Sequence, residues 1–406
     1  MNFYGNVISQ GFNFVGQFFQ FAILARLLSP EDFGILGVIF AISQFSYIFF
    51  DYGFMIFGVR YTVLNRARRS LIGRMLSVSI VIKSIFFLIN AVVIVLFHLF
   101  NEASEISFWA LIGVSAGFYF WALNPIWLLL GFEKGFWIAG LAFIYRILPV
   151  LVLIFFQNIS IEMFALIYVF FAAFSCVVGI ELIRRFFNVH FQPPTWHRVL
   201  HVVKRYIDPF LASLMTTGYT TLTVLCASNI IGSVEAGYYL SADRLCRFFV
   251  AGLSPVIQSL YPVFVKMHQK NNSAFWPQFM KLTLGILSLA IIVFIIFTEA
   301  SDEITQVIYG EKYIPRVSEL LKMLAPLCII LAISSLFANL VFHVYDSSKK
   351  LRNIYLVAGL ANAIILLPLI NKYKVYGVVY TSIVVELLIV AAMFVFVYRR
   401  FNGKHG

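Results

Sequence analysis

The chain contains little charge. Only 12% of its 406 residues are Asp, Glu, Lys or Arg, whereas 61% are hydrophobic, and the mean hydropathy is +0.91. A soluble core cannot hide that much apolar surface, but a lipid bilayer can, because side chains that face lipid need no contact with water. The composition therefore excludes an ordinary soluble fold and predicts an integral membrane protein.

Signals of catalysis and of cofactor binding are also missing. No glycine-rich phosphate-binding loop is present, and no stretch outside the apolar segments is long enough for an ATP-hydrolysing domain. His197 and His201 stand four residues apart in a loop, without neighbouring Cys or carboxylate ligands. Four cysteines lie inside apolar segments without metal or disulfide spacing, and we expect small buried residues at Cys176, Cys226, Cys246 and Cys328. We therefore expect no catalytic residue, no metal and no cofactor, which favours transport over chemistry.

Apolar segments long enough to cross a bilayer recur along the chain. Each is predicted to be a helix, because backbone groups in lipid must be satisfied within the segment, and the runs do not alternate as barrel strands do. We place twelve spans, at 3–25, 35–58, 77–99, 107–130, 136–156, 161–183, 206–229, 237–264, 279–298, 320–344, 353–370 and 376–398. They form an N-terminal six-helix lobe at 1–185, a basic linker at 186–205 and a C-terminal six-helix lobe at 206–406.

Basic residues gather in alternate loops. Most of the 30 Lys and Arg lie at 59–76, 131–135, 184–205, 265–281, 345–352 and the C-terminus, whereas acids outnumber them in the other loops. This positive-inside bias predicts that both termini are cytoplasmic, although Arg26 alone, just after the first span, favours the reverse. The net charge of +12 is thus explained by topology and by attraction to anionic lipid rather than by nucleic-acid binding.

The first span carries a row of five side-chain amides. At about 100° per residue they fall within roughly 80° of one helix face, and they are Asn6, Gln10, Asn13, Gln17 and Gln20. A shift of 203 residues places the last four of them on hydroxyl residues of the seventh span, namely Ser213, Thr216, Thr220 and Thr223. Six spans per half give both halves the same orientation, so we expect a parallel repeat.

These two polar rows need a polar environment. We expect them to face each other across a hydrated substrate cavity between two six-helix bundles. The alternative is that the amides only hold neighbouring helices together, as polar residues do in membranes. One or two such groups are enough for that purpose, and a five-membered row with a counterpart in the other half therefore favours the cavity.

Ionisable residues at membrane depth are costly and are functional candidates by default. Arg146 and Glu386 lie near the middle of the fifth and twelfth spans. An arginine there suits a diphosphate, and a buried carboxylate is suited to carrying a proton. Asp51, Asp243, Arg244 and Arg247 complete the set of candidates for diphosphate binding or ion coupling.

Asp243 with one of its neighbouring arginines, and two further charged residues, also have explanations that involve no function. Asp243 could simply neutralise Arg244 or Arg247. Lys83 and Asp208 lie near span ends, and we expect them to reach the membrane interface or to cap a helix.

Four stretches are similar to one known family. They are ARLLSPEDFGILG at 25–37, NPIWLLLGFEKGFWIAGLAFIYRI at 124–147, GYYLSADRL followed by SPVIQSLYP at 237–262, and IYGEKYIPRVSELLKMLAP at 308–326. In this order they resemble the bacterial polysaccharide-repeat transporters, the O-antigen flippases, of the multidrug/oligosaccharidyl-lipid/polysaccharide exporter superfamily. Arg146, Asp243 and Arg244 match positions where that family keeps polar residues.

The resemblance implies an all-α fold of two bundles that form a V around a central cavity. It also implies transport of an oligosaccharide linked to undecaprenyl diphosphate across the bacterial inner membrane, by alternating access. Coupling to a proton or sodium gradient is left open. Expected partners are membrane lipids, the polyprenyl-diphosphate-linked oligosaccharide, a polysaccharide polymerase and a chain-length regulator. The alternatives are a cation-coupled multidrug exporter of the same superfamily and a membrane glycan polymerase or ligase.

Overall fold

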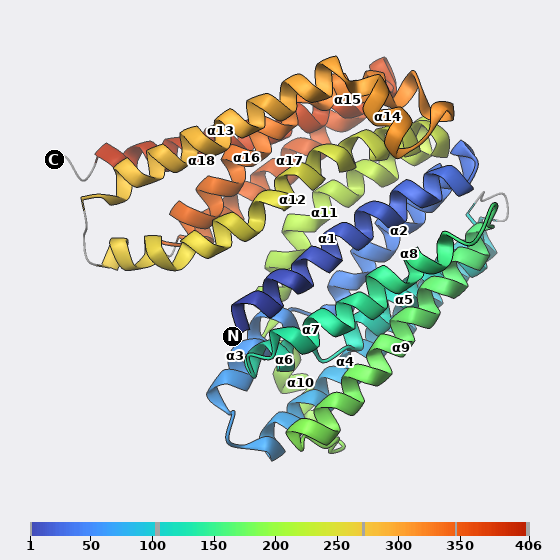
Figure 1. The fold of residues 1–406 in the computed structure, drawn as a ribbon. Helices are drawn as coiled ribbons and strands as arrows, with labels where there is room; N and C mark the ends of the chain where they lie inside the picture. The colour runs from blue at the N-terminus through green and yellow to red at the C-terminus, as the bar shows by residue number, and fades with distance from the viewer. Residues whose placement is uncertain (1, 102–105, 270–272, 346, 403–406) are drawn as a thin grey trace. The chain divides into compact units, whose positions relative to one another are not determined.

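The protein is helical almost throughout the part that the computed structural model describes, residues 2–101, 106–269, 273–345 and 347–402 (Figure 1). The chain divides into two compact units, Met1–Thr217 and Gly218–Gly406, and each is described by itself. The all-α membrane fold is thus confirmed. The twelve spans in two repeats, the lobe boundaries and the V-shaped cavity stay predictions.

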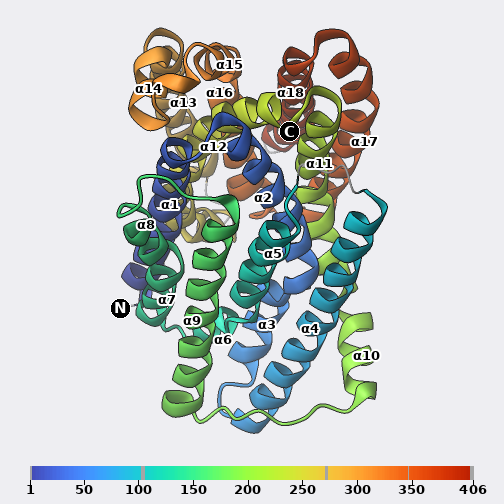
Figure 2. The same ribbon diagram turned by 90° about the vertical axis from the view of Figure 1, so that its right-hand side faces the viewer.

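The first unit holds the helices up to the middle of α11. These helices are α1 (Asn2–Leu27), α2 (Pro30–Asp51), α3 (Phe54–Leu64), α4 (Arg69–Phe100), α5 (Phe108–Leu123), α6 (Ile126–Gly131), α7 (Gly135–Ala142), η1 (Phe143–Ile147), α8 (Leu148–Leu153), α9 (Ile161–Phe187), α10 (Trp196–Arg205) and α11 (Ile207–Ile231). Figure 2 shows α5 and α9 side by side. Helix α9 is the last long helix before the linker.

The second unit holds the remainder of the chain. Its helices are α12 (Ser233–Gln269), α13 (Phe275–Glu299), α14 (Ser301–Ile308), η2 (Glu311–Tyr313), α15 (Arg316–Leu324), α16 (Pro326–Phe337), η3 (Ala338–Phe342), α17 (Ser348–Tyr373) and α18 (Val375–Asn402). The long helices α17 and α18 form a hairpin (Figure 2). Both lie in the apolar part of the sequence that we assigned to the last two spans.

Eight helical segments in the described ranges are long and apolar enough to cross a membrane, or nine when α15 and α16, bent by 43°, count as one. The protein is therefore a multi-pass membrane protein. Three predicted spans, which correspond to α1, α11 and α12, fall outside this set. Each of these three helices contains residues whose side chains lie outside the described part of the chain, to which this set is limited.

Local sequence determines where the helices begin. Ser29 is the N-cap of α2: its hydroxyl accepts a hydrogen bond from the Asp32 backbone N–H at 3.0 Å, and Pro30 occupies the first helical position. Ser107 and Ser160 cap α5 and α9 in the same way. The residues SPED at 29–32, within the family-like stretch at 25–37, thus form the start of a helix.

Three predicted spans of the first unit are broken helices. The second stops at Tyr52 and resumes after Gly53, both with positive φ (48° and 78°), a conformation that glycine adopts at no steric cost. The fourth breaks at Asn124, because Pro125 disfavours a helical conformation in the residue before it. The fifth contains a π-helical segment, η1, in place of regular α-helix. The spacing of apolar residues does not predict these three breaks, because it depends on which side chains are buried and not on the backbone conformation.

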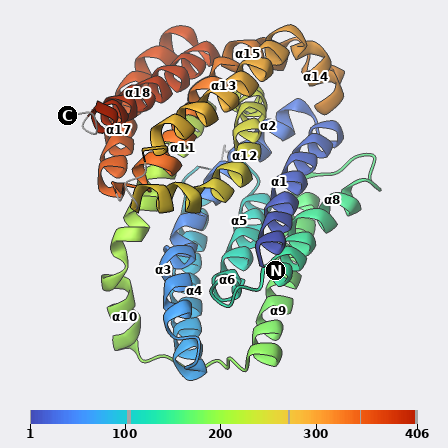
Figure 3. The ribbon, with the colours of Figure 1, turned by 60° about the vertical axis from the view of Figure 1, so that its left-hand side comes forward.

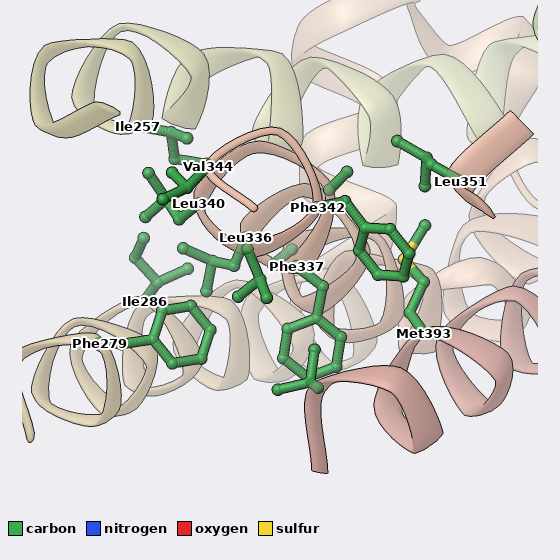
Figure 4. Packing of buried hydrophobic residues seen from close by; sticks show 14 of the residues in the cluster. Ile257, Phe279, Ile286, Leu336, Phe337, Leu340, Phe342, Val344, Leu351 and Met393 are labelled. Atoms are coloured by element: carbon green, nitrogen blue, oxygen red, sulfur yellow. The ribbon is translucent and has the colours of Figure 1, made fainter. Parts of the chain in front are cut away.

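Each unit has its own apolar core. Figure 4 shows the core of the second unit, where Phe337, Leu340 and Phe342 pack against Phe279 of α13 and Met393 of α18. Burial of such side chains contributes about 1.5–3 kcal/mol each. Cys176, Cys246 and Cys328 are buried, as predicted, whereas Cys226 is only half-buried.

Helix α1 packs closely against the broken fifth span, and Figure 3 shows α1 next to α8, the last part of that span. A Cβ at Gly5 would lie 2.4 Å from the backbone of Gly135, and one at Gly16 would lie 2.7 Å from the Cβ of Arg146. Both gaps are closer than two non-bonded carbons can approach. The absence of side chains at these glycines therefore lets α1 approach the backbone around Arg146.

This close approach predicts a difference between two glycine substitutions in one helix. Gly16→Ala should displace α1 from η1 and lower both the apparent Tm and transport, because overpacking costs about 1–3 kcal/mol. Gly11→Ala is the matched control, since a Cβ there meets nothing within 4 Å. Thermal unfolding in detergent and transport assays compare the two variants. Equal melting temperatures would contradict this account of the contact.

Candidate functional site

The amide row of α1 has two kinds of member. Asn13, Gln17 and Gln10 are half-buried, and the Asn13 side-chain Nδ2 donates to the Ser9 carbonyl one turn earlier at 3.0 Å. Gln20 is only 1% exposed, and neither its Nε2 nor its Oε1 has a hydrogen-bond partner in the described part of the chain. The side chain of Asn6 lies outside the described residues. The row therefore continues into the interior of the first unit.

Gln20 lies one turn beyond the contact between α1 and Arg146. Gly16 and Gln20 are four residues apart and so lie on the same helix face, and Gly16 touches the backbone of Arg146. Phe12, one turn earlier, makes an edge contact with Phe143 of η1, with ring centroids 5.5 Å apart. This face of α1 thus carries its buried amide toward the region of η1.

Arg146 lies in η1 among tyrosines. Its Cζ lies 4.4 Å from the centre of the Tyr145 ring, and the hydroxyls of Tyr47 and Tyr168 are within electrostatic range. The Tyr145 and Tyr168 hydroxyls hydrogen-bond to each other, and Trp121 stacks on Tyr145 at 4.2 Å. The buried Arg146 Nε has no hydrogen-bond partner in the described chain. π-Helical turns of this kind are frequent at functional sites.

The chemistry around Arg146 suits a polar anionic ligand. A guanidinium offers forked donors that match phosphate oxygens, and the orphaned Nε is one such donor. Aromatic rings with hydroxyl groups give an apolar face and a polar tip, which suits sugars. Arg146 forms no ion pair with an acid among the described contacts, and Asp51 lies within electrostatic range of the same Tyr47 hydroxyl.

Asp51 and Lys83 form a second charged site in the first unit, on α2 and α4. The Lys83 Nζ lies 3.9 Å from the Asp51 Oδ1, donates to the Ala122 carbonyl at 2.5 Å and lies 5.0 Å from the centre of the Phe54 ring. Lys83 is 1% exposed. The prediction that Lys83 reaches the interface is therefore wrong, because an internal carboxylate and a carbonyl satisfy it instead. The side chain of Asp208 lies outside the described residues.

The hydroxyl row of α11 is described at one position. Thr223 is buried, and its hydroxyl donates to the Asn362 Oδ1 of α17 at 3.1 Å. The side chains of Ser213, Thr216 and Thr220 lie outside the described residues. The pairing of the two polar rows across a cavity therefore stays a prediction.

The second unit holds a buried triad of charges. The Arg247 Nε lies 2.7 Å from the Asp243 Oδ2 one turn earlier in α12, and the Arg247 Nη1 lies 3.9 Å from the Glu386 Oε1 of α18. Both acids are buried, whereas the Arg247 side chain is 37% exposed. The Asp243 Oδ1 has no hydrogen-bond partner in the described chain. The Arg247 guanidinium thus lies between the two carboxylates.

The structure decides which arginine pairs with Asp243. Arg247 forms the ion pair, because residues four apart share a helix face, and Arg244 lies within electrostatic range of both Tyr309 and Asp243. Tyr309 is fixed by its own hydroxyl, which donates to the Ser241 carbonyl at 3.0 Å. Of the two pairings left open by the sequence, the one with Arg247 is observed.

Several residues of these sites were missed from the sequence. One is Tyr239, whose hydroxyl forms a hydrogen bond of 2.7 Å with the Ser382 hydroxyl beside the charge triad. The others are the tyrosines around Arg146. Spacing could have found part of this, since Tyr239, Asp243 and Arg247 are four residues apart on one face of α12. The tyrosines around Arg146 come from α2, η1 and α9, and no spacing along the chain brings those helices together.

Comparisons with known proteins agree with this fold. The family model of the polysaccharide biosynthesis proteins matches residues 2–268. A curated protein of Escherichia coli (strain K12), named "Putative O-antigen transporter", is 23% identical over 403 residues, covering 96% of this chain and 94% of its own.

Two solved transporters of low sequence identity share the fold. An inward-facing multidrug resistance MATE family transporter of the MOP superfamily is 13% identical, covers 98% of both chains and has a TM-score of 0.77. The lipid II flippase MurJ, in an inward closed conformation, is 16% identical and covers 97% of this chain and 87% of its own, with a TM-score of 0.71. At such identities the likeness concerns the fold alone. Because the family model covers most of the chain, this protein belongs to the polysaccharide biosynthesis protein family.

Proposed function

We propose that this protein is a flippase that moves an undecaprenyl-diphosphate-linked oligosaccharide, of the O-antigen repeat-unit type, across the bacterial inner membrane by alternating access. The observation that carries the proposal is the family match over residues 2–268, which joins a multi-pass membrane fold to polysaccharide biosynthesis. The name of the Escherichia coli relative and that of the MurJ structure point to the same class of lipid-linked cargo. Both termini are proposed to be cytoplasmic.

Arg146 is proposed to bind the diphosphate of this cargo. It is a cation without a recorded acidic partner, and the half-buried rings of Tyr47 and Trp121 offer surfaces on which sugar rings can pack. The half-buried amides of α1 would contact sugar hydroxyls, because amides both donate and accept hydrogen bonds. The lipid tail needs no site of its own, since the bilayer solvates it.

The triad of the second unit is proposed to couple transport to an ion gradient. Two buried carboxylates share one arginine, so one acid can take up a proton without leaving a second cation unpaired. A population shift between inward- and outward-open states would then follow the protonation of this acid. A polysaccharide polymerase and a chain-length regulator are the protein partners that such a cargo implies.

A multidrug exporter of the same superfamily is the second candidate, because the MATE transporter structure covers 98% of this chain. A cation exporter needs acidic groups at its substrate site. The charged group at the Arg146 site is instead basic, with aromatic and hydroxyl neighbours. The basic site therefore favours the anionic cargo.

Proteoliposomes test the proposal directly. Purified protein should move a short undecaprenyl-diphosphate-linked oligosaccharide to the opposite leaflet, measured as loss of label to an enzyme confined to one side. Failure to move this lipid, together with efflux of cationic dyes, would favour the drug exporter. Chemical conversion of the lipid in detergent, where no leaflets exist, would instead indicate a glycan polymerase or ligase.

A further inference from the structure

A cavity of about 300 Å³ opens where the linker helix α10 packs on α3 and α4, within the first unit. That volume corresponds to roughly ten water molecules, which is the size of a small polar headgroup. The lining is Tyr61, Leu71, Arg74, Met75, Val78, His197, Arg198, His201, Val202, Arg205 and Tyr206. None of the groups assigned above to the transported substrate or to ion coupling takes part.

The polar side of this α10 cavity is basic. Three arginines and two histidines line it, and no acid is among the lining residues. Arg74 of α4 and Arg198 of α10 both line the cavity, and the Tyr61 hydroxyl lies within electrostatic range of both. The Arg74 Nε donates to the Gln192 Oε1 at 2.9 Å, and this contact holds the guanidinium in place. Such a set of donors suits a phosphate group.

Helix α10, which closes the α10 cavity, packs tightly against the rest of the first unit. Tyr206 stacks on Phe57 of α3 at 3.8 Å, and the Tyr52 hydroxyl donates to the Val203 carbonyl at 3.0 Å. Val199 and Val202 are buried against the bundle. The linker before α10 also lies against α4, where a Cβ at Gly73 would approach the His190 carbonyl to 2.3 Å. The cavity is therefore preformed, which lowers the cost of binding a ligand.

A different face of α10 is apolar and exposed. Trp196 and Leu200, four residues apart, are 61% and 41% exposed. The same short helix carries Lys204 and Arg205 in its last turn. A helix that exposes Trp and Leu beside basic residues is typical of the membrane–water interface. A ligand in the α10 cavity would thus lie at the depth of lipid headgroups.

We propose that the α10 cavity binds the phosphate headgroup of an acidic membrane phospholipid. Its phosphate contacts Arg74 and Arg198, and its glycerol backbone and first methylenes lie over Leu71, Met75 and Val78. The lipid bridges α10 to α4, so it fastens the linker helix to the first unit. Free phosphate shares this chemistry but has no acyl chain for the apolar lining, and the observed combination therefore favours a lipid.

The test compares pocket arginines with a lysine on the same helix. Wild-type protein in phosphatidylcholine nanodiscs should bind phosphatidylglycerol, added in increasing fractions and counted by native mass spectrometry. The double variant Arg74→Gln/Arg198→Gln should bind it at least ~10-fold more weakly, because each substitution removes a charged hydrogen-bond donor to the phosphate. Lys204→Gln removes the same type of charge from α10 outside the lining and should stay within about twofold of wild type.

Three outcomes would overturn the proposal. The double variant could bind phosphatidylglycerol as wild type does, or Lys204→Gln could weaken binding as strongly, which would indicate general surface charge. Inorganic pyrophosphate could bind to the arginine pair while phosphatidylglycerol does not, which would indicate a soluble anion. Unchanged melting of the double variant in pure phosphatidylcholine confirms that it folds. If it melts early, Arg205→Gln alone replaces it, with the same expected direction.

Discussion

Replacement of Arg146 by Ala should abolish surface polysaccharide while the protein stays at its normal level in the membrane. The substitution removes the cation of the tyrosine-lined site, and with it at least two charge-assisted hydrogen bonds to a diphosphate. At about 1.5–3 kcal/mol each, their loss weakens binding by roughly 100-fold or more. Quantitative blots of the surface glycan in a strain that lacks the wild-type copy measure the effect.

One further variant separates the charge of Arg146 from its shape, and a second variant elsewhere serves as the control. Arg146→Lys keeps the charge but loses the planar fork, so we expect partial activity, well below wild type. Arg184→Ala is the matched control, since Arg184 is exposed in the last turn of α9 and pairs only with Glu181 among the described contacts. Normal surface glycan in the Arg146→Ala strain would refute the diphosphate role proposed here.

Replacement of Arg247 by Leu should destabilise the second unit strongly. The substitution leaves two buried carboxylates without their shared cation, and breaking such a pair costs about 3 kcal/mol. The apparent Tm in detergent should therefore fall by roughly 5–10 °C. Fluorescence-monitored melting of purified variants measures the shift.

A second substitution should restore much of this stability. In Arg247→Leu/Asp243→Asn the nearer carboxylate is neutral, so the double variant should melt well above the single one. Glu386→Gln alone should cost little, because its distance to Arg247 is 3.9 Å and Asp243 keeps the closer contact at 2.7 Å. Additive effects of the two substitutions in the double variant would mean that Arg247 and Asp243 do not interact energetically.

The helical membrane fold follows from composition, because no other backbone structure satisfies long apolar runs in lipid. Helix boundaries follow where chemistry marks them, as at Ser29 with Pro30. The breaks at Tyr52 and within 143–147 do not follow. They depend on backbone conformations that the neighbouring helices impose, and the apolar pattern continues across both.

The candidate sites likewise include some contacts that the sequence predicts and others that it does not. Charges four residues apart on one helix, such as Asp243 and Arg247, could be paired from spacing alone. Lys83 could not be placed, because its partner Asp51 is on another helix and its carbonyl acceptor is on a third. The cavity beside α10 escaped notice for a related reason. His197 and His201 alone indicated nothing, and only packing against α4 adds Arg74 to them.

The π-helical turn at 143–147 has a consequence for the history of this chain. Such a turn contains one residue more than the corresponding α-helical turn, as if a single residue had been inserted. Removal of one residue there would restore regular α-helix but rotate all that follows by about 100° relative to all that precedes. Alignments of more distant relatives should therefore show a one-residue gap at this place. Relatives with the gap should present a different residue where this chain presents its arginine.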